Sequence, residues 1–421
     1  MWRRMSSCPR SFSNQKTIRP IKAEVAMFDR IREMFKRFFP PVQPLSPGVY
    51  IFNAPPEAAF PYRLHLRIEG DGSGILIINA STVLHLNQTG AEYAYHLIQQ
   101  HTEDEVASDL SKRYRVSKEQ AKQDFISFRD RLMTLIETPD LDPVTYLEFE
   151  RLNVHEQRLS APLRLDCALT YATPHPRTAG STPVERVKRE LLTEEWQTIL
   201  EKAWKAGIPH VIFTGGEPTL RPDLVELVDF AEKLGMVTGV LSSGYRFSEH
   251  KFLNDILQAG LDHLMIVLDE NEEYCWEAIR DSIASDLYVT VHLTITPRNQ
   301  SRIAEIIQKL AGLKVKSLSL SVEEISLKQT LQQAQELAFA NEMSIVWDLP
   351  VPYSDLNPIN LELQTDGHGE YFDGAGNAWL YVEPDGDVLP AQGRTILLGN
   401  LLTDEWTTIW QNAQALNQQQ A

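Results

Sequence analysis

Hydrophobic and polar positions follow two rhythms along this chain, and each rhythm predicts a different kind of element. From residue 163 onward, short apolar runs alternate with longer segments in which apolar residues recur every three to four positions. Short apolar runs predict buried strands, and the longer period predicts helices. Six strand–helix pairs follow one another, which predicts an α/β fold with a parallel sheet and outer helices, a partial (β/α)6 TIM-like barrel. The predicted pairs are Leu163–Leu169 with Glu194–Ala206, His210–Thr214 with Asp223–Leu234, Met236–Leu241 with Lys251–Ala259, Leu261–Leu268 with Cys275–Ala284, Tyr288–Thr296 with Arg302–Ala311, and Lys316–Val322 with Leu327–Asn341.

A strict alternation of apolar and polar residues precedes this pattern. It covers residues 62–68 and is followed by a glycine-rich turn and two more apolar runs that end at 86. Alternation with period two predicts strands joined by a hairpin turn. Thr102 and Glu105 then form a capping-box signal at the start of the second of three helical segments. We expect residues 60–138 to form a small α+β domain, winged-helix-like, with strands followed by helices at 88–100, 103–114 and 117–136.

Two further regions complete the predicted organisation. Residues 139–160 contain prolines and a charged stretch, and we expect them to form a linker to the barrel, which spans 161–344. Residues 345–421 are expected to hold short strands, turns and a short helix around 404–411. The glutamine-rich tail from Gln411 is expected to be a frayed terminus.

Composition and charge narrow the class of protein. The 421 residues carry 40 Lys and Arg against 57 Asp and Glu, a net charge of −17, which argues against general nucleic-acid binding. The three cysteines, Cys8, Cys167 and Cys275, are far apart and show no Cys-x2-Cys spacing, so we expect reduced thiols and a cytoplasmic protein. No run of about 18 apolar residues is present, so no transmembrane segment is predicted.

The N-terminal region, residues 1–59, differs from the rest because it is basic. Its first twenty residues resemble a transit peptide in composition, and a translation start at Met27 is the alternative. Residues 24–39 then place apolar side chains on one helical face flanked by Arg and Lys. Such a helix could make weak contact with an anionic membrane surface, or it could dock on the acidic body of the chain itself.

The candidate chemistry lies in the loops after the predicted strands, because parallel sheets place ligands at the carboxyl ends of their strands. The loop after the second strand contains Gly215, Gly216, Glu217 and Pro218. Two glycines let a backbone approach a ligand closely, and they also suit a tight turn. Both interpretations stay open on the residues alone. The third strand ends in Ser242 and Ser243 before a glycine, and the fourth strand ends in Asp269.

This combination resembles the radical S-adenosylmethionine (radical SAM) superfamily. The segment Glu383–Pro390, followed by Leu398–Asn400 and Trp406–Trp410, is similar to a SPASM-type C-terminal extension. Residues 60–138 resemble a PqqD-type peptide-recognition domain. The resemblance implies that the motif's backbone and Glu217 hold the amino group of the methionine moiety of SAM. The full set of cofactor-binding residues that it implies is Gly215, Gly216, Glu217, Pro218, Ser242, Ser243 and Asp269.

The same resemblance implies a partner. PqqD-type domains bind leader peptides by adding the peptide as an extra strand to a small sheet. Residues 60–138 are therefore expected to bind a peptide, and the chain to take part in ribosomal peptide modification.

The chain departs from the family pattern at its iron–sulfur ligands. Active members hold a [4Fe–4S] cluster with Cys-x3-Cys-x2-Cys in the loop after the first barrel strand. Taking Cys167 as the first ligand position places Tyr171 and Pro174 at the other two, and proline has no side-chain donor. The SPASM-type position after Pro390 is Ala391, and no cysteine follows Cys275. The family's cluster is therefore expected from the resemblance but not supported by the cysteines present.

Two functions follow from this departure. The chain is either a non-catalytic scaffold that binds a peptide, alone or beside an intact radical SAM partner, or an enzyme of peptide maturation with an unusually ligated cluster. His155, Asp166 and His175 lie near the degenerate loop in sequence and could bind a metal, although solvated loop residues are the default interpretation.

Overall fold

The computed structural model describes residues 45–55, 62–78, 82–138, 159–174, 180–285, 287–346, 349–359 and 374–420. Within them, the six predicted strand–helix pairs are confirmed, and the chain is an α/β protein with a parallel sheet. The pairs are β5 (Arg164–Thr170) with α6 (Thr193–Lys205), β6 (His210–Gly215) with α7 (Leu224–Leu234), β7 (Val237–Ser242) with α8 (His250–Gln258), β8 (His263–Val267) with α9 (Glu273–Ala284), β9 (Tyr288–Ile295) with α10 (Ile303–Gly312), and β10 (Ser317–Val322) with α11 (Lys328–Ala340). Short 3-10 turns interrupt the loops at η2 (Val184–Arg186), η3 (Pro218–Leu220), η4 (Gln300–Arg302) and η5 (Ile325–Leu327).

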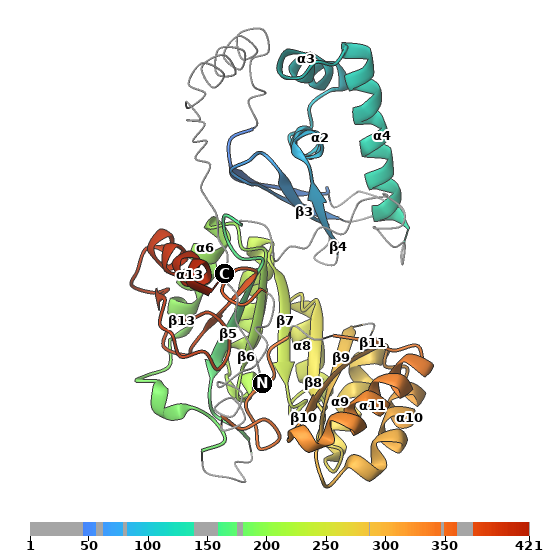
Figure 1. Cartoon of the computed structure of the whole chain (residues 1–421), viewed down its shortest axis with the longest axis vertical. Coiled ribbons are helices and arrows are strands. Elements are labelled where there is room, and N and C mark those ends of the chain that lie inside the picture. The colour runs from blue at the N-terminus through green and yellow to red at the C-terminus, as the bar shows by residue number, and fades with distance from the viewer. Residues whose placement is uncertain are drawn as a thin grey trace, which may run out of the picture.

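The large sheet has ten strands in the order β11-β10-β9-β8-β7-β6-β5-β12-β13-β14. Neighbouring strands from β5 to β11 are parallel, and the helices cover one face of this curved layer (Figure 1). Alternate side chains separate the two faces. On β6, Val211 and Phe213 join the main core against the helices, whereas Ile212 belongs to a separate cluster on the opposite, concave face.

The C-terminal region extends this sheet past β5. It contributes β11 (Ser344–Ile345) at one edge and β12 (Trp379–Val382), β13 (Asp387–Leu389) and β14 (Gly399–Asn400) at the other. β12 runs parallel to β5, and β13 and β14 continue antiparallel.

The last helix, α13 (Trp406–Gln420), is longer than expected, so the prediction of a frayed tail from Gln411 is wrong. Ile409 and Ala413 are fully buried, and Asn417 Nδ2 donates to the Gly376 carbonyl at 2.9 Å. These tertiary contacts hold a segment whose glutamine-rich composition gives little sign of order.

The small domain is a four-stranded antiparallel sheet covered by three helices. Its elements are β1 (Gly48–Asn53), β2 (Arg63–Ile68), β3 (Gly74–Ile78), β4 (Thr82–Leu86), α2 (Gln88–Ile98), α3 (Glu103–Arg113) and α4 (Lys118–Glu137), with the strands in sequence order. The predicted capping box of Thr102 and Glu105 is present at α3. β1 lies in the segment that sequence analysis assigned to the basic N-terminal region.

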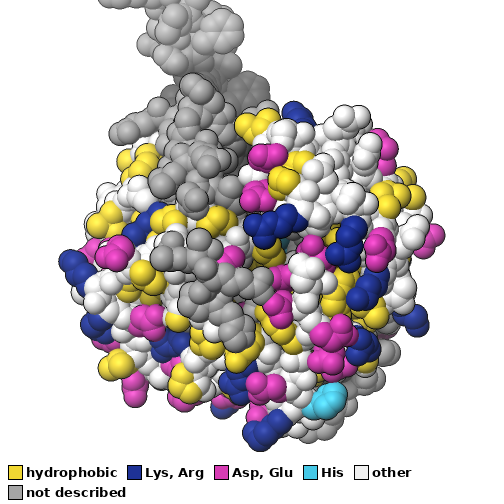
Figure 2. All heavy atoms as spheres, turned by 90° about the horizontal axis from the view of Figure 1, so that it is seen from below, with side chains coloured by type: hydrophobic (Ala, Val, Ile, Leu, Met, Phe, Trp, Pro, Cys, Tyr) yellow, Lys and Arg dark blue, Asp and Glu magenta, His cyan; other side chains and the backbone are white. Residues whose placement is uncertain are grey.

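This domain packs on the amino ends of the large sheet's strands, above the barrel in Figure 1. Arg67 is 2% exposed, and its Nη1 donates to the carbonyls of Pro162 and Gly207, which precede β5 and β6. Arg63 pairs with Glu232 at 2.7 Å. The carboxyl ends of the strands, where ligands are expected, therefore lie at the opposite end of the barrel, which Figure 2 shows from below.

Several predictions fall on residues outside the described ranges: the basic helix at 24–39, nearly all of the linker at 139–160, and His155 and His175. No helix in the described part of the chain is long and apolar enough to cross a membrane.

Candidate functional site

Strand β6 delivers the Gly-Gly-Glu-Pro motif to the carboxyl edge of the large sheet. It ends at Gly215, whose φ of 126° lies in the region that favours glycine. A Cβ on Gly215 would collide with the carbonyl oxygen of Thr170, and one on Gly216 with that of Ala172. The amides of Gly216 and Glu217 donate to these same two oxygens at 2.8 Å. Both glycines are therefore required by the close packing of the motif against the segment that follows β5.

The Glu217 carboxylate ties this loop to the end of β7. The residue is 1% exposed, and its Oε1 accepts from Thr219 N at 3.1 Å, Thr219 Oγ1 at 2.6 Å and Ser242 Oγ at 2.8 Å. Its Oε2 accepts from Ser243 N at 2.8 Å and Ser243 Oγ at 2.5 Å. The structure thus brings Glu217, Ser242 and Ser243 together. It also uses the carboxylate's full acceptor capacity, which is about four lone-pair sites, within the protein.

The remaining predicted cofactor residues, Pro218 and Asp269, lie in the loops that follow β6 and β8. Pro218 opens the 3-10 turn η3. The Asp269 carboxylate accepts from the backbone and side-chain nitrogens of Asn271, just before α9. Cys275 lies beside Ser243, because its Sγ donates to the Ser243 carbonyl at 3.2 Å. Burial raises the pKa of the Cys275 thiol to about 12, so it is a neutral thiol.

Cys167 does not lie in the loop after the first barrel strand, so its assignment to the first cluster position is wrong. β5 continues to Thr170, and Cys167 pairs within it with Phe213 of β6 on one side and Val382 of β12 on the other. Its side chain is fully buried in the main core beneath the helices. Burial raises the pKa of the thiol well above its usual range. Cys167 is therefore a packed core residue.

Tyr171 and Pro174, the other two assigned positions, supply no thiolate. The Tyr171 hydroxyl donates to Glu383 Oε1 at 3.1 Å, and burial raises the pKa of this phenol well above its usual range. Arg186 approaches the same carboxylate at 3.6 Å. Pro174 is half-buried, and Ala391 lies in the bend that follows β13. No three His, Cys, Asp or Glu side chains in the described part of the chain are placed to hold a metal ion, so these residues do not fit a [4Fe–4S] cluster.

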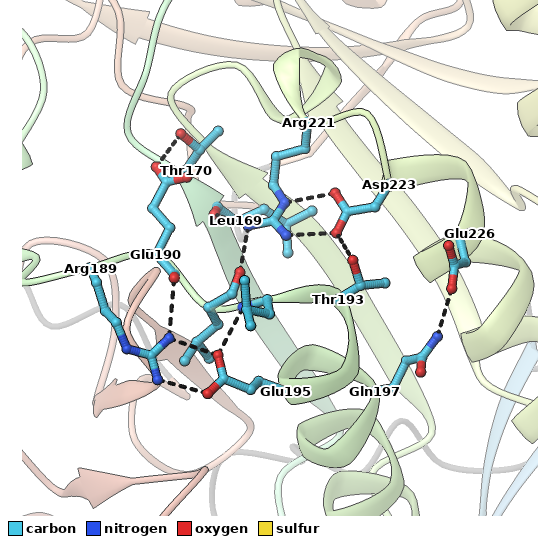
Figure 3. Close-up of polar contacts among 12 residues, drawn as sticks. Leu169, Thr170, Arg189, Glu190, Thr193, Glu195, Gln197, Arg221, Asp223 and Glu226 are labelled. Atoms are coloured by element: carbon cyan, nitrogen blue, oxygen red, sulfur yellow. Dashed lines mark hydrogen bonds and ion pairs between the residues drawn. The ribbon is translucent and has the colours of Figure 1, made fainter.

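Polar contacts hold the described residues that lie beside the loop after β5 (Figure 3). Arg221, which follows the motif, forms a two-bond ion pair with Asp223 and donates to the carbonyls of Leu169 and Leu191. Thr170 Oγ1 donates to Glu190 at 2.5 Å. These contacts hold the described residues on both sides of the loop after β5.

Sequence analysis missed a group of polar side chains on the concave face of β9 and β10. His292 is 1% exposed, and its two ring nitrogens lie 2.9 Å from Ser319 Oγ and 3.0 Å from Ser321 Oγ. Burial lowers the pKa of His292 to about 4, so the ring is neutral. The available signal was the alternation of polar Thr290, His292 and Thr294 within an otherwise apolar strand.

The comparisons with known proteins agree with this fold and this motif. Residues 167–289 match the family model of the Radical SAM superfamily. Residues 167–289 are therefore similar to a radical SAM domain, and they include the strands and loops that contain the Gly-Gly-Glu-Pro motif.

Curated relatives of this chain include two proteins named PqqA peptide cyclase. The one from Streptomyces rochei is 26% identical over 287 residues, which cover 62% of this chain and 78% of the relative. The one from Gluconobacter oxydans (strain 621H) is 27% identical over 264 residues, which cover 56% and 72%.

Similar solved structures include the Streptococcus suis protein SuiB. SuiB bound to S-adenosylmethionine is 16% identical with a TM-score of 0.54, covering 86% of this chain and 88% of SuiB. SuiB bound to its precursor peptide SuiA is 15% identical with a TM-score of 0.52, covering 82% and 86%. At this identity the likeness shows the shared fold, including both the barrel and the flanking regions.

Proposed function

We propose that this chain is a non-catalytic, peptide-binding or partner-binding member of the radical SAM/SPASM group, acting in ribosomal peptide modification. One observation carries the proposal. The thiolates that a radical SAM cluster needs are missing from the loop after β5: Cys167 is buried in the strand on its helix-facing side, and no other cysteine lies between it and Cys275. A [4Fe–4S] cluster requires several closely spaced thiolates.

The small domain supports the peptide-binding half of the proposal. β4 pairs with β3 alone within the described sheet, so it presents a sheet edge. A sheet edge offers unpaired amide and carbonyl groups to an extended peptide, the mode by which PqqD-type domains bind leader peptides. The proposal takes 60–138, together with β1, as the recognition domain, 161–344 as the barrel and 345–421 as the SPASM-like extension, within a cytoplasmic protein.

The first test is iron and acid-labile sulfide per chain after strictly anaerobic reconstitution, with Cys167→Ala as the control. We expect wild type to hold no more iron than this control, because Cys167 is a core residue. About four irons per wild-type chain would overturn the non-catalytic assignment and favour the alternative, a peptide-maturing enzyme with unusual cluster ligands.

The second test is peptide binding. Fluorescence anisotropy of labelled leader-peptide candidates encoded beside this chain should show saturable binding, and scrambled peptides of equal composition should not bind. If none of the candidates binds, the peptide-recognition role is refuted.

A further inference from the structure

One segment of the chain lies across the concave face of the barrel, where a ligand of this fold would enter. Residues 349–359, which we call the strap, follow the last barrel strand, β11. Leu349 and Val351 pack against a cluster of buried residues on β6, β7 and β8. The members of that cluster are Ile212, Leu241, Met265 and Val267. These residues alternate along their strands with the ones that pack on the helices, so the strap lies on the face opposite the helices.

The strap then reaches the Gly-Gly-Glu-Pro motif itself. The Tyr353 amide donates to the Gly215 carbonyl at 2.8 Å, and the Tyr353 side chain is fully buried. Its ring meets the Tyr171 ring edge-on, with centroids 5.4 Å apart. The strap is therefore seated on both the motif and the segment that follows β5.

Other contacts hold the strap at both ends. Gln392, from the C-terminal extension, donates from Nε2 to the Val351 carbonyl at 2.8 Å. Asn357 donates to the same carbonyl at 2.8 Å, which folds the strap back on itself. Ile359 N donates to the Ser181 carbonyl at 3.2 Å, beside the loop after β5.

Groups that the family resemblance assigns to a bound SAM molecule already have partners. The strap supplies one of them, because the Gly215 carbonyl accepts the Tyr353 amide. The neighbouring Glu217 carboxylate accepts five hydrogen bonds from Thr219, Ser242 and Ser243. An incoming ammonium group would compete with these bonds. Because the strap belongs to the same chain, its effective concentration at the site is on the order of millimolar or higher.

We propose that the strap is a built-in occupant of the barrel's ligand edge, and that SAM and the seated strap exclude one another. This inference rests on the proposed non-catalytic function and gives its physical basis at the motif: the edge has become a docking site for the chain's own backbone.

The test compares three forms of the full chain. They are wild type, the strap-release double variant Leu349→Asp/Val351→Asp, and the control Ile325→Asp, which changes a side chain that is 88% exposed. Equilibrium dialysis with radiolabelled SAM measures binding, and hydrogen exchange follows the Tyr353 amide. We expect wild type and control to take up little SAM at about 0.1 mM, because the seated strap competes for the site, and to protect Tyr353. The release variant should exchange Tyr353 at least about 10-fold faster and bind SAM at least about 10-fold more tightly.

Two results would overturn the inference: wild type that binds SAM while the Tyr353 amide stays protected, or a folded release variant that binds SAM no better than wild type. If the release variant does not fold, wild-type exchange decides, since an unprotected Tyr353 amide would refute a seated strap. Iron content and peptide anisotropy on the same preparations judge the proposed function separately, because neither depends on the strap.

Discussion

Replacing Glu217 with alanine separates a structural role of the Gly-Gly-Glu-Pro motif from a ligand-binding role. The substitution removes a buried carboxylate that accepts hydrogen bonds from the backbone amides of Thr219 and Ser243 and from three hydroxyls. The hydroxyls can turn to other acceptors, but the two amides cannot. Each buried amide left without an acceptor costs about 1–3 kcal/mol. We therefore expect Glu217→Ala to destabilise the barrel by about 4 kcal/mol, a large share of the roughly 5–15 kcal/mol that stabilises a typical domain.

Urea unfolding followed by tryptophan fluorescence measures this loss in the right part of the chain. Apart from Trp2, every tryptophan lies between Trp196 and Trp410, in the barrel and the C-terminal extension. Glu201→Ala is the matched control, because Glu201 pairs with Lys205 on the surface with 48% of its side chain exposed. Such a pair contributes about 0–1 kcal/mol.

Glu217→Gln refines the measurement. Glutamine keeps the size of the side chain and one acceptor oxygen. Its NH2 group, however, faces the hydrogen-bond donors that the second carboxylate oxygen accepts in wild type, so the stability of Glu217→Gln should fall between those of wild type and Glu217→Ala. If Glu217→Ala unfolds within about 0.5 kcal/mol of the Glu201→Ala control, the carboxylate is not a structural tie and this reasoning fails.

Three further predictions test other parts of the site. Gly216→Ala should lower the urea midpoint strongly, because the added methyl collides with a backbone carbonyl. Gly312→Ala, with nothing within 4 Å of the new methyl, should leave the midpoint unchanged or raise it slightly, so equal midpoints would contradict the packing role of the motif. The pKa of His292 is lowered to about 4, below its unfolded value of 6.5, so its contribution to stability, on the order of 3 kcal/mol, is present above pH 6.5 and is lost as pH falls toward 4. His292→Asn should therefore flatten the dependence of stability on pH in that window, and an unchanged pH dependence would refute this prediction. The raised thiol pKa values of Cys167 and Cys275 predict that neither reacts with Ellman's reagent at pH 8 until the chain unfolds. They also predict that stability falls as pH rises above about 8.5, the pKa of a free thiol. Rapid labelling of either residue in the native protein would count against their burial.

The sequence predicted the large architecture well because the signals for it are local. Each barrel strand is a short apolar run and each helix has its own apolar face, so six strand–helix pairs were recognisable before any contact between them was known. The glycines of the motif were recognisable for the same reason, since a tight turn at the end of a strand has a local signature. The C-terminal helix was underestimated because its order comes from contacts such as Asn417 with Gly376, far away in sequence.

The site was only partly predictable because its chemistry depends on which segments meet. Glu217, Ser242 and Ser243 were singled out together, but the sequence did not show that they bond to one another. Cys167 was assigned to the cluster loop although the predicted strand Leu163–Leu169 already contained it. Pairing with β6 and β12 places it inside β5, which continues to Thr170. His292 was missed although its alternation with apolar neighbours marked it.

By itself, the sequence determined the α/β repeat, the motif at the end of the second barrel strand and the scarcity of cysteine ligands, because these depend on residue types and on spacing along the chain. Only the tertiary structure decided that Cys167 packs in the core, that Glu217 is saturated by its neighbours and that residues 349–359 cover the concave face. The strap shows the physical reason. Its residues have no helical or strand period, and their position follows from the apolar surface of β6, β7 and β8 and from the carbonyl of Gly215. Only folding brings these partners next to the strap.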